Sequence, residues 1–166
     1  MDSGMDTRRI ALTGVLVSLA MVLSYLESLF PAFIAVPGIR IGLANIAIVF
    51  ALYRLGFRTA LGISVFRVVL SALLFGSLIS MAYSLSGALI SLVMMALLKR
   101  TGLFGTVGVS VVGGVSHNLG QIAFACLILQ TKAIAYYAPV LILSGTASGV
   151  VVGLVSAAVI TRLEGE

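Results

Sequence analysis

The sequence predicts an all-α integral membrane protein that forms a single membrane domain over residues 1–166. The first observation is composition: 61% of the residues are apolar, 9% are charged, and the mean hydropathy is +1.24. Soluble domains are about 45–50% apolar and about 25% charged. The second observation is that several apolar runs approach the length of about 20 residues that a helix needs to cross a hydrocarbon core of about 30 Å. We therefore expect a multi-pass protein of the cell membrane.

Six apolar runs follow one another along the chain, and each is a predicted membrane span. A cytoplasmic tail is expected over residues 1–9, and the spans are expected at about residues 10–30, 41–53, 59–75, 79–98, 103–129 and 136–160. The first span is too long for a cleaved signal peptide and lacks the small-residue cleavage site. The connections are brief, so the sequence predicts a bundle of six helices without a second domain.

The second span is shorter than the others and follows an unusual segment. At about 1.5 Å per residue it covers only about 20 Å, which falls short of the bilayer. The preceding residues 30–40 are apolar but include Pro31, Pro37 and Gly38. Non-helical backbone at membrane depth is tolerated only where protein buries it or where it lines a cavity. We expect this segment to dip back over the outer mouth of the bundle; an ordinary outer loop on a tilted helix is the alternative.

The cationic residues predict an orientation. Seven of them fall on one side of the membrane if six spans alternate: Arg8, Arg9, Arg54, Arg58, Lys99, Arg100 and Arg162. Arg40 and Lys132 fall on the other side, and Arg67 lies inside a span. Because positively charged loops stay in the cytoplasm, both termini are predicted to be cytoplasmic. This placement accounts for the net charge of +5, so we expect no nucleic-acid partner.

Small residues at helical spacing predict close contacts between helices. Gly145, Gly149 and Gly153 recur at every fourth position of the sixth span. They form one ridge that another helix can approach closely. A looser ridge near the start of the first span consists of four residues: Ala11, Gly14, Val15 and Ser18. We expect the looser ridge to serve either internal packing or contact with a partner helix.

Three polar side chains stand out in the first three spans. Glu27 lies toward the outer end of the first span, Asn45 near the outer start of the second, and Arg67 near the middle of the third. An ionisable residue near the bilayer centre costs roughly 2.5–3.5 kcal/mol, so each is a functional candidate. Arg67 is expected either to anchor an anionic substrate group through its bidentate guanidinium or to form a structural brace with Glu27.

A second polar group lies halfway along the fifth span. His117 and Gln121 are four residues apart, and Asn118 and Gln121 are three apart, so these side chains are expected to share one helical face. The group is expected either to contact a ligand that enters from outside or to form an interhelical hydrogen-bond cluster, which is common in membrane bundles. Tyr83 and Ser86 are expected to line the same outer half.

Missing motifs exclude three kinds of chemistry. No Walker A pattern occurs, so the chain has no P-loop ATP site of its own. Its only aspartates are Asp2 and Asp6, so it lacks the clustered aspartates that hold Mg²⁺ in enzymes acting on prenyl diphosphates. One His and one Cys cannot supply the three or four protein ligands of a zinc site. We therefore expect no catalytic residue, no metal site and no cofactor in this chain.

Five ordered motifs carry a resemblance to a known family. They are residues 23–31 (LSYLESLFP), 37–46 (PGIRIGLANI), 74–78 (LFGSL), 83–87 (YSLSG) and 116–121 (SHNLGQ). They resemble the membrane family known both as the Gx transporter family and as heptaprenyl diphosphate synthase component I. The similarity covers nearly the whole chain.

The six-span plan and the run from Pro37 to Asn45 are also similar to the substrate-binding S components of energy-coupling factor importers. This resemblance implies an S-component-like six-helix bundle that captures a small, partly apolar nutrient, or an isoprenoid or quinone precursor, from outside. It implies docking on a transmembrane T component with two cytoplasmic ATPases, which hydrolyse the ATP. The ligand is expected beneath the loop joining the first two spans. The first-span ridge, with Ala11 followed by Val15, takes the place of the family's Ala-x-x-x-Ala contact to the T component.

The expected substrate-binding residues are nine: Glu27, Arg40, Asn45, Arg67, Tyr83, Ser86, His117, Asn118 and Gln121. If Arg67 or Arg40 binds the substrate directly, the substrate carries an anionic group. The synthase name of the same family implies an alternative function. In that case the chain is an accessory membrane subunit of an enzyme that makes a long isoprenoid diphosphate, and a partner chain supplies the catalytic aspartates.

Overall fold

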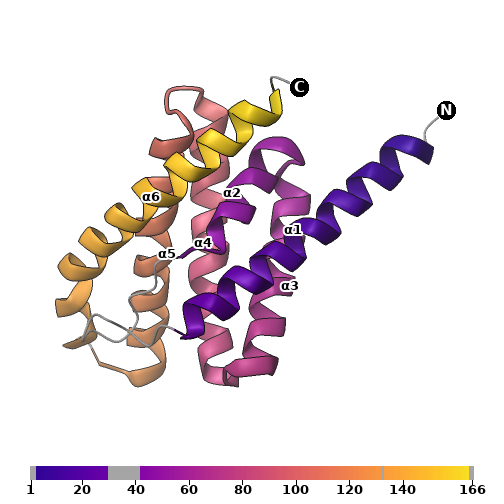
Figure 1. Ribbon diagram of the computed structural model, residues 1–166. Helices are drawn as coiled ribbons and strands as arrows, with labels where there is room; N and C mark the ends of the chain where they lie inside the picture. Colours follow the sequence, from indigo (N-terminus) through magenta and orange to yellow (C-terminus); the bar gives the residue numbers. More distant parts are fainter. Residues whose placement is uncertain (1–2, 30–41, 132, 165–166) are drawn as a thin grey trace.

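The computed structural model describes residues 3–29, 42–131 and 133–164, which form helices joined by short turns. The elements are α1 (Ser3–Leu29), α2 (Asn45–Arg54), α3 (Phe57–Phe75), α4 (Leu78–Thr101), α5 (Thr106–Leu129), the 3-10 helix η1 (Ala133–Tyr137) and α6 (Ala138–Glu164) (Figure 1). No strand occurs in the described ranges. The all-α class predicted from composition is therefore confirmed.

Five helical segments are long and apolar enough to cross a membrane. They lie at Thr7–Leu29, Phe57–Phe75, Leu78–Thr101, Thr106–Leu129 and Ala133–Leu163, the last including η1. The predicted multi-pass membrane location is confirmed by these five segments. The expected second span is not of this length, because α2 has 10 residues and a rise of about 15 Å. It crosses about half of a hydrocarbon core, so the described chain has five full-length candidate spans and one half-span.

The ends of several helices differ from the predicted span limits. α1 begins at Ser3, inside the segment expected as a tail, and α4 and α6 continue to Thr101 and Glu164. Hydropathy marks only the part of a helix that lies in hydrocarbon, whereas the backbone hydrogen bonds let the helix continue into the polar interface. α4 stops at Gly102, whose φ of 68° is in the left-handed region that favours glycine.

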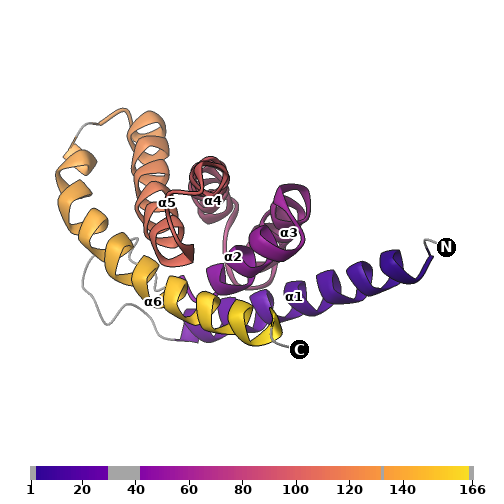
Figure 2. The ribbon, with the colours of Figure 1, turned by 90° about the horizontal axis from the view of Figure 1, so that it is seen from above.

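The helices pack in two layers, with α3, α4 and α5 in a row and α1 and α6 forming a cover over it (Figure 2). Seen from above, α3, α4 and α5 stand side by side in sequence order (Figure 2). α6 packs on α5, α1 packs on α3, and α2 lies between this cover and the row (Figure 2). The N-terminal half of α1 extends away from the other helices (Figure 1). Both chain termini lie at the same end of the bundle (Figure 1).

The short helix α2 forms the centre of the core. Residues 47–52 of α2 are all buried, so neighbours cover the helix on every side. Leu16 of α1, Ile63 of α3, Leu92 of α4 and Val152 of α6 belong to the same buried cluster. A helix that is apolar all round is stable only when it is enclosed in this way.

The glycine ridge of α6 packs directly on the backbone of α5. A Cβ atom on Gly149 would lie 2.6 Å from the Val111 Cα, and one on Gly153 would lie 2.7 Å from the Val107 Cα. A Cβ on Gly145 would lie 2.8 Å from the Gly114 carbonyl oxygen. The predicted close approach at this ridge is confirmed, and its partner is α5.

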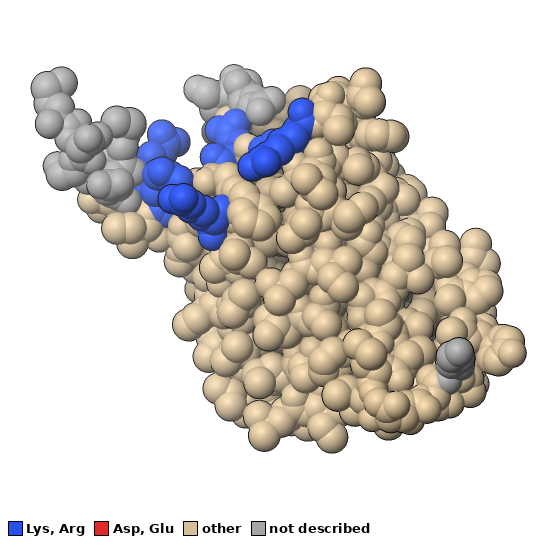
Figure 3. Space-filling model, turned by 180° about the vertical axis from the view of Figure 1, so that it is seen from behind, with Lys and Arg blue, Asp and Glu red and all other residues tan. Residues whose placement is uncertain are grey.

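Lys and Arg side chains gather at the end of the molecule where the termini lie (Figure 3). Two of these cations hold the C-terminal end of α2. Lys99 donates to the Leu52 and Tyr53 carbonyl oxygens at 2.8 and 3.4 Å, and its Nζ lies 4.8 Å from the centre of the Tyr53 ring. Arg9 donates to the Leu55 carbonyl oxygen at 3.2 Å. These bonds satisfy carbonyls that the end of a helix leaves without partners.

Candidate functional site

Arg67 lies half-buried on α3, against the C-terminal half of α1. Its Nη1 donates to the Ser24 hydroxyl oxygen at 3.4 Å. One turn further along α3, the Ser71 hydroxyl contacts the Met21 sulfur at 3.7 Å. Because Ser24 and Glu27 are three residues apart, they share one face of α1. The structure therefore places Arg67 of α3 against the part of α1 that carries Glu27, its predicted partner.

Glu27 closes the turn that begins α2. Its Oε1 accepts a hydrogen bond from the Gly42 backbone N–H at 2.6 Å. Gly42 has a φ of 74°, and its carbonyl oxygen accepts from the Asn45 N–H at 2.8 Å. A carboxylate that accepts a backbone N–H makes a short, charge-assisted hydrogen bond. Glu27 thus positions the start of α2, a role that the sequence did not predict.

We predict that Glu27→Ala weakens the start of α2. Removing the carboxylate leaves the Gly42 N–H without its acceptor, which costs about 1–3 kcal/mol for a buried donor. Hydrogen exchange of the amides over residues 42–46 in detergent should accelerate accordingly. Ser28→Ala is the matched control, because Ser28 is exposed and donates only to the Tyr25 carbonyl oxygen. Equal protection of residues 42–46 in both variants would contradict this role.

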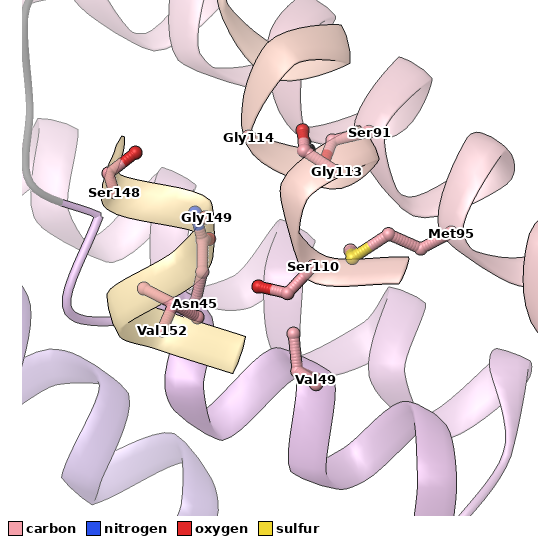
Figure 4. A pocket seen from close by; sticks show the side chains of 10 residues that line it. All are labelled: Asn45, Val49, Ser91, Met95, Ser110, Gly113, Gly114, Ser148, Gly149 and Val152. Atoms are coloured by element: carbon pink, nitrogen blue, oxygen red, sulfur yellow. Dashed lines mark hydrogen bonds between the residues drawn. The ribbon is translucent and has the colours of Figure 1, made fainter. Parts of the chain in front are cut away.

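Asn45, the first residue of α2, lines a small cavity at the centre of the bundle (Figure 4). The other polar side chains in its wall are Ser91, Ser110 and Ser148. The cavity has a volume of about 10 Å³, whereas pockets for organic ligands measure about 300–1,000 Å³. It therefore does not hold an organic substrate. Sequence reasoning missed the three serines, although each is a polar residue inside a long apolar run.

Four predicted residues meet along the seam between α4 and α5. The Ser86 hydroxyl donates to the Tyr83 carbonyl oxygen at 2.8 Å and reaches the Gly120 carbonyl oxygen at 3.5 Å. The Tyr83 ring packs edge-on against Phe124 with centroids 5.3 Å apart. The two remaining members, His117 and Gln121, lie beside the backbone of Gly87: a Cβ added there would meet the His117 ring at 3.2 Å and the Gln121 Cγ at 2.9 Å.

Asn118 is separated from this seam. It is buried, and its Nδ2 donates to the Leu141 carbonyl oxygen of α6 at 2.7 Å. His117, the preceding residue, faces Gly87 of α4 instead. The polar group expected on one face of the fifth span is therefore divided between two helix interfaces. The Asn118 bond matches the alternative of an interhelical hydrogen bond.

A protein-family model matches most of the chain. The model described as heptaprenyl diphosphate synthase component I matches residues 16–159. The chain belongs to the heptaprenyl diphosphate synthase component I family. The comparisons with curated proteins and with solved structures gave no match.

The match to the heptaprenyl diphosphate synthase component I family spans all nine predicted substrate-binding residues. It begins after Ala11, Gly14 and Val15, the first three residues of the looser ridge. Arg40, and the whole segment expected to cap the outer mouth, lie outside the described residues. The binding of a substrate by the nine residues stays a prediction.

The looser ridge on α1 does not serve internal packing. Ala11, Gly14, Val15 and Ser18 are all exposed, and the relative exposure of Val15 is 62%. A Cβ on Gly14 would meet nothing within 4 Å. The ridge lies on the face of α1 opposite to Leu16 and Ala20, which are buried. In this member of the family, the ridge is open to lipid or to another protein.

Proposed function

We propose that this chain is the membrane subunit, component I, of a heptaprenyl diphosphate synthase. The observation that carries the proposal is the family match over residues 16–159. The subunit is not catalytic by itself, because its only aspartates are Asp2 and Asp6. Mg²⁺ prefers oxygen ligands such as carboxylates, so the Mg²⁺–diphosphate chemistry belongs to a partner chain. The membrane subunit would hold that partner where the long apolar product enters the bilayer.

The proposed orientation places the cationic end of the bundle in the cytoplasm. Lys and Arg gather at the end that also carries both termini (Figure 3). Positive charge near the ends of spans is retained on the cytoplasmic side. In this arrangement both termini are cytoplasmic.

The cationic end is the proposed face for the catalytic partner. Arg8, Arg54, Arg58, Arg100 and Arg162 are exposed there, whereas Arg9 and Lys99 hold α2. A catalytic partner with an acidic face would be complementary in charge to this end of the bundle. Complementary charge steers association and fixes the relative orientation of two partners.

The experiment is affinity purification of the tagged chain from its own membranes, followed by native mass spectrometry. We expect an aspartate-rich prenyl diphosphate synthase subunit to copurify. The double variant Arg58→Gln/Arg100→Gln should reduce its retention by about tenfold, equivalent to about 1.4 kcal/mol. Gln130→Ala, at the opposite end of α5, is the control and should retain the partner fully.

A second candidate function, the S component of an energy-coupling factor importer, is favoured by the open ridge on α1. The ridge offers a second helix a close approach, as docking on a T component with two ATPases requires. Glu27, Arg67 and Asn45 would then contact a small, partly apolar substrate under the outer loop. The same purification separates the two functions. Recovery of a T component, ATPases and a small molecule that Arg67→Ala releases would overturn the synthase proposal.

A further inference from the structure

Four helices line a small, partly open cavity of about 10 Å³ (Figure 4). This volume is the space that a single water molecule requires. Asn45 begins α2, and the end of α2 at Arg54 lies about 14 Å away along the helix axis. Since the hydrocarbon core is about 30 Å thick and Arg54 belongs to the cationic end, the cavity lies at about half depth.

Two hydroxyl groups in the wall have already used their protons. Ser91 of α4 donates to the Gly113 carbonyl oxygen at 2.8 Å, and Ser148 of α6 donates to the Gly145 carbonyl oxygen at 3.2 Å. A hydroxyl has one donor and two acceptor lone pairs. Both oxygens therefore remain able to accept a hydrogen bond from a molecule inside the cavity.

The hydroxyl of Ser110 on α5 is a third polar group that faces the cavity (Figure 4). Ser110 is only 3% exposed, and within the described ranges no hydrogen bond of its hydroxyl is found. Figure 4 shows the hydroxyl directed toward Asn45 and Val152, across the space that the wall encloses. A hydroxyl that has no protein partner and faces a cavity can donate to a water molecule there. A molecule in the cavity would supply the missing partner.

The chemistry of the wall selects the occupant. Among the described residues that line it, four are polar and none is charged, while Val49, Met95 and Val152 make the wall partly apolar. An ion enclosed by this wall would be a buried charge without a counter-charge, which is strongly unfavourable. A water molecule is neutral, fits the volume and uses two to four polar partners.

We propose that this cavity binds one ordered water molecule. Its hydrogen bonds go to the serine hydroxyls of α4, α5 and α6 and to the Asn45 amide of α2. The water thus bridges side chains of the half-span α2 and of three full-length helices by hydrogen bonds. The proposal is independent of whether the protein serves a synthase or an importer.

Radiolytic hydroxyl-radical footprinting of the full chain in detergent tests the proposal. Radicals form where water is bound, and Met95 lines the cavity although it is only 3% exposed. We expect the Met95 thioether to be oxidised in the wild-type protein. Ser110→Val, which fills the cavity, should reduce this oxidation to background while oxidation of the neighbouring Met94 stays unchanged. The wild-type measurement does not depend on the folding of any variant.

Two results would overturn the proposal. Wild-type Met95 that stays unoxidised would mean that the cavity is dry. A melting temperature that rises with sodium chloride, but not with choline chloride at equal ionic strength, would mean that a cation occupies the site. Oxidised Met95 together with equal melting temperatures in the two salts is the expected outcome.

Discussion

Replacing Gly149 by leucine is expected to prevent stable folding of the bundle. The leucine Cβ would lie 2.6 Å from the Val111 Cα and 2.9 Å from the Ser110 carbonyl oxygen. Both atoms belong to the α5 backbone and cannot rotate away, so α6 would have to leave α5. Helix association in membranes depends on close packing at such small residues. Overpacking costs about 1–3 kcal/mol or more even in cores that can adjust, and this interface has rigid backbone on both sides.

Thermal unfolding and size-exclusion chromatography in detergent measure this effect. Gly62→Leu is the matched control, because Gly62 lies on an exposed part of α3 and a Cβ there meets nothing within 4 Å. The control should elute as the wild-type protein does and melt close to it. If Gly149→Leu behaves like Gly62→Leu, the close packing of α5 on α6 is incorrect.

Replacing Lys99 by methionine is expected to destabilise the C-terminal end of α2. The Lys99 ammonium group donates to two α2 carbonyl oxygens, at 2.8 and 3.4 Å, and lies above the Tyr53 ring. Hydrogen bonds to charged groups contribute about 1.5–3 kcal/mol. Methionine retains the apolar stem but cannot donate, so the Leu52 and Tyr53 carbonyls lose this partner in a poorly hydrated place.

The matched control is Arg100→Met, which removes an exposed cation next to Lys99. We expect a clear fall in the unfolding temperature for Lys99→Met and a small change for Arg100→Met. Hydrogen exchange of the Leu55 and Gly56 amides, which both donate to the Ala51 carbonyl oxygen, should accelerate in Lys99→Met alone. Equal effects in the two variants would show that general charge, rather than the contact with α2, stabilises this end.

Gly149→Leu and Lys99→Met test folding, whereas Arg58→Gln/Arg100→Gln tests association with the partner. Gly149 and Lys99 belong to contacts inside the bundle, whereas Arg58 and Arg100 are exposed at the proposed partner face. A variant that folds and loses its partner therefore identifies a surface role. A variant that loses both identifies a structural role.

Composition and local pattern were sufficient for the class of the protein. Long apolar runs determine helices in a membrane, because only a helix or a closed barrel satisfies the backbone there. The sequence also predicted that the second span is short, because its apolar run has too few residues to cross the hydrocarbon core. The start of α2 at Asn45, however, depends on the turn at Gly42. The ridge of Gly145, Gly149 and Gly153 was also readable, because residues four apart share one face.

Only the tertiary structure decided what each polar residue contacts. His117 and Asn118 are adjacent in sequence, yet one faces α4 and the other donates to α6. Consecutive residues point about 100° apart around a helix of 3.6 residues per turn. Periodicity therefore specifies the angle between two side chains, but the helix that lies in each direction is determined by packing of the whole bundle. For the same reason, Ser91, Ser110 and Ser148 lie far apart in sequence and line one cavity.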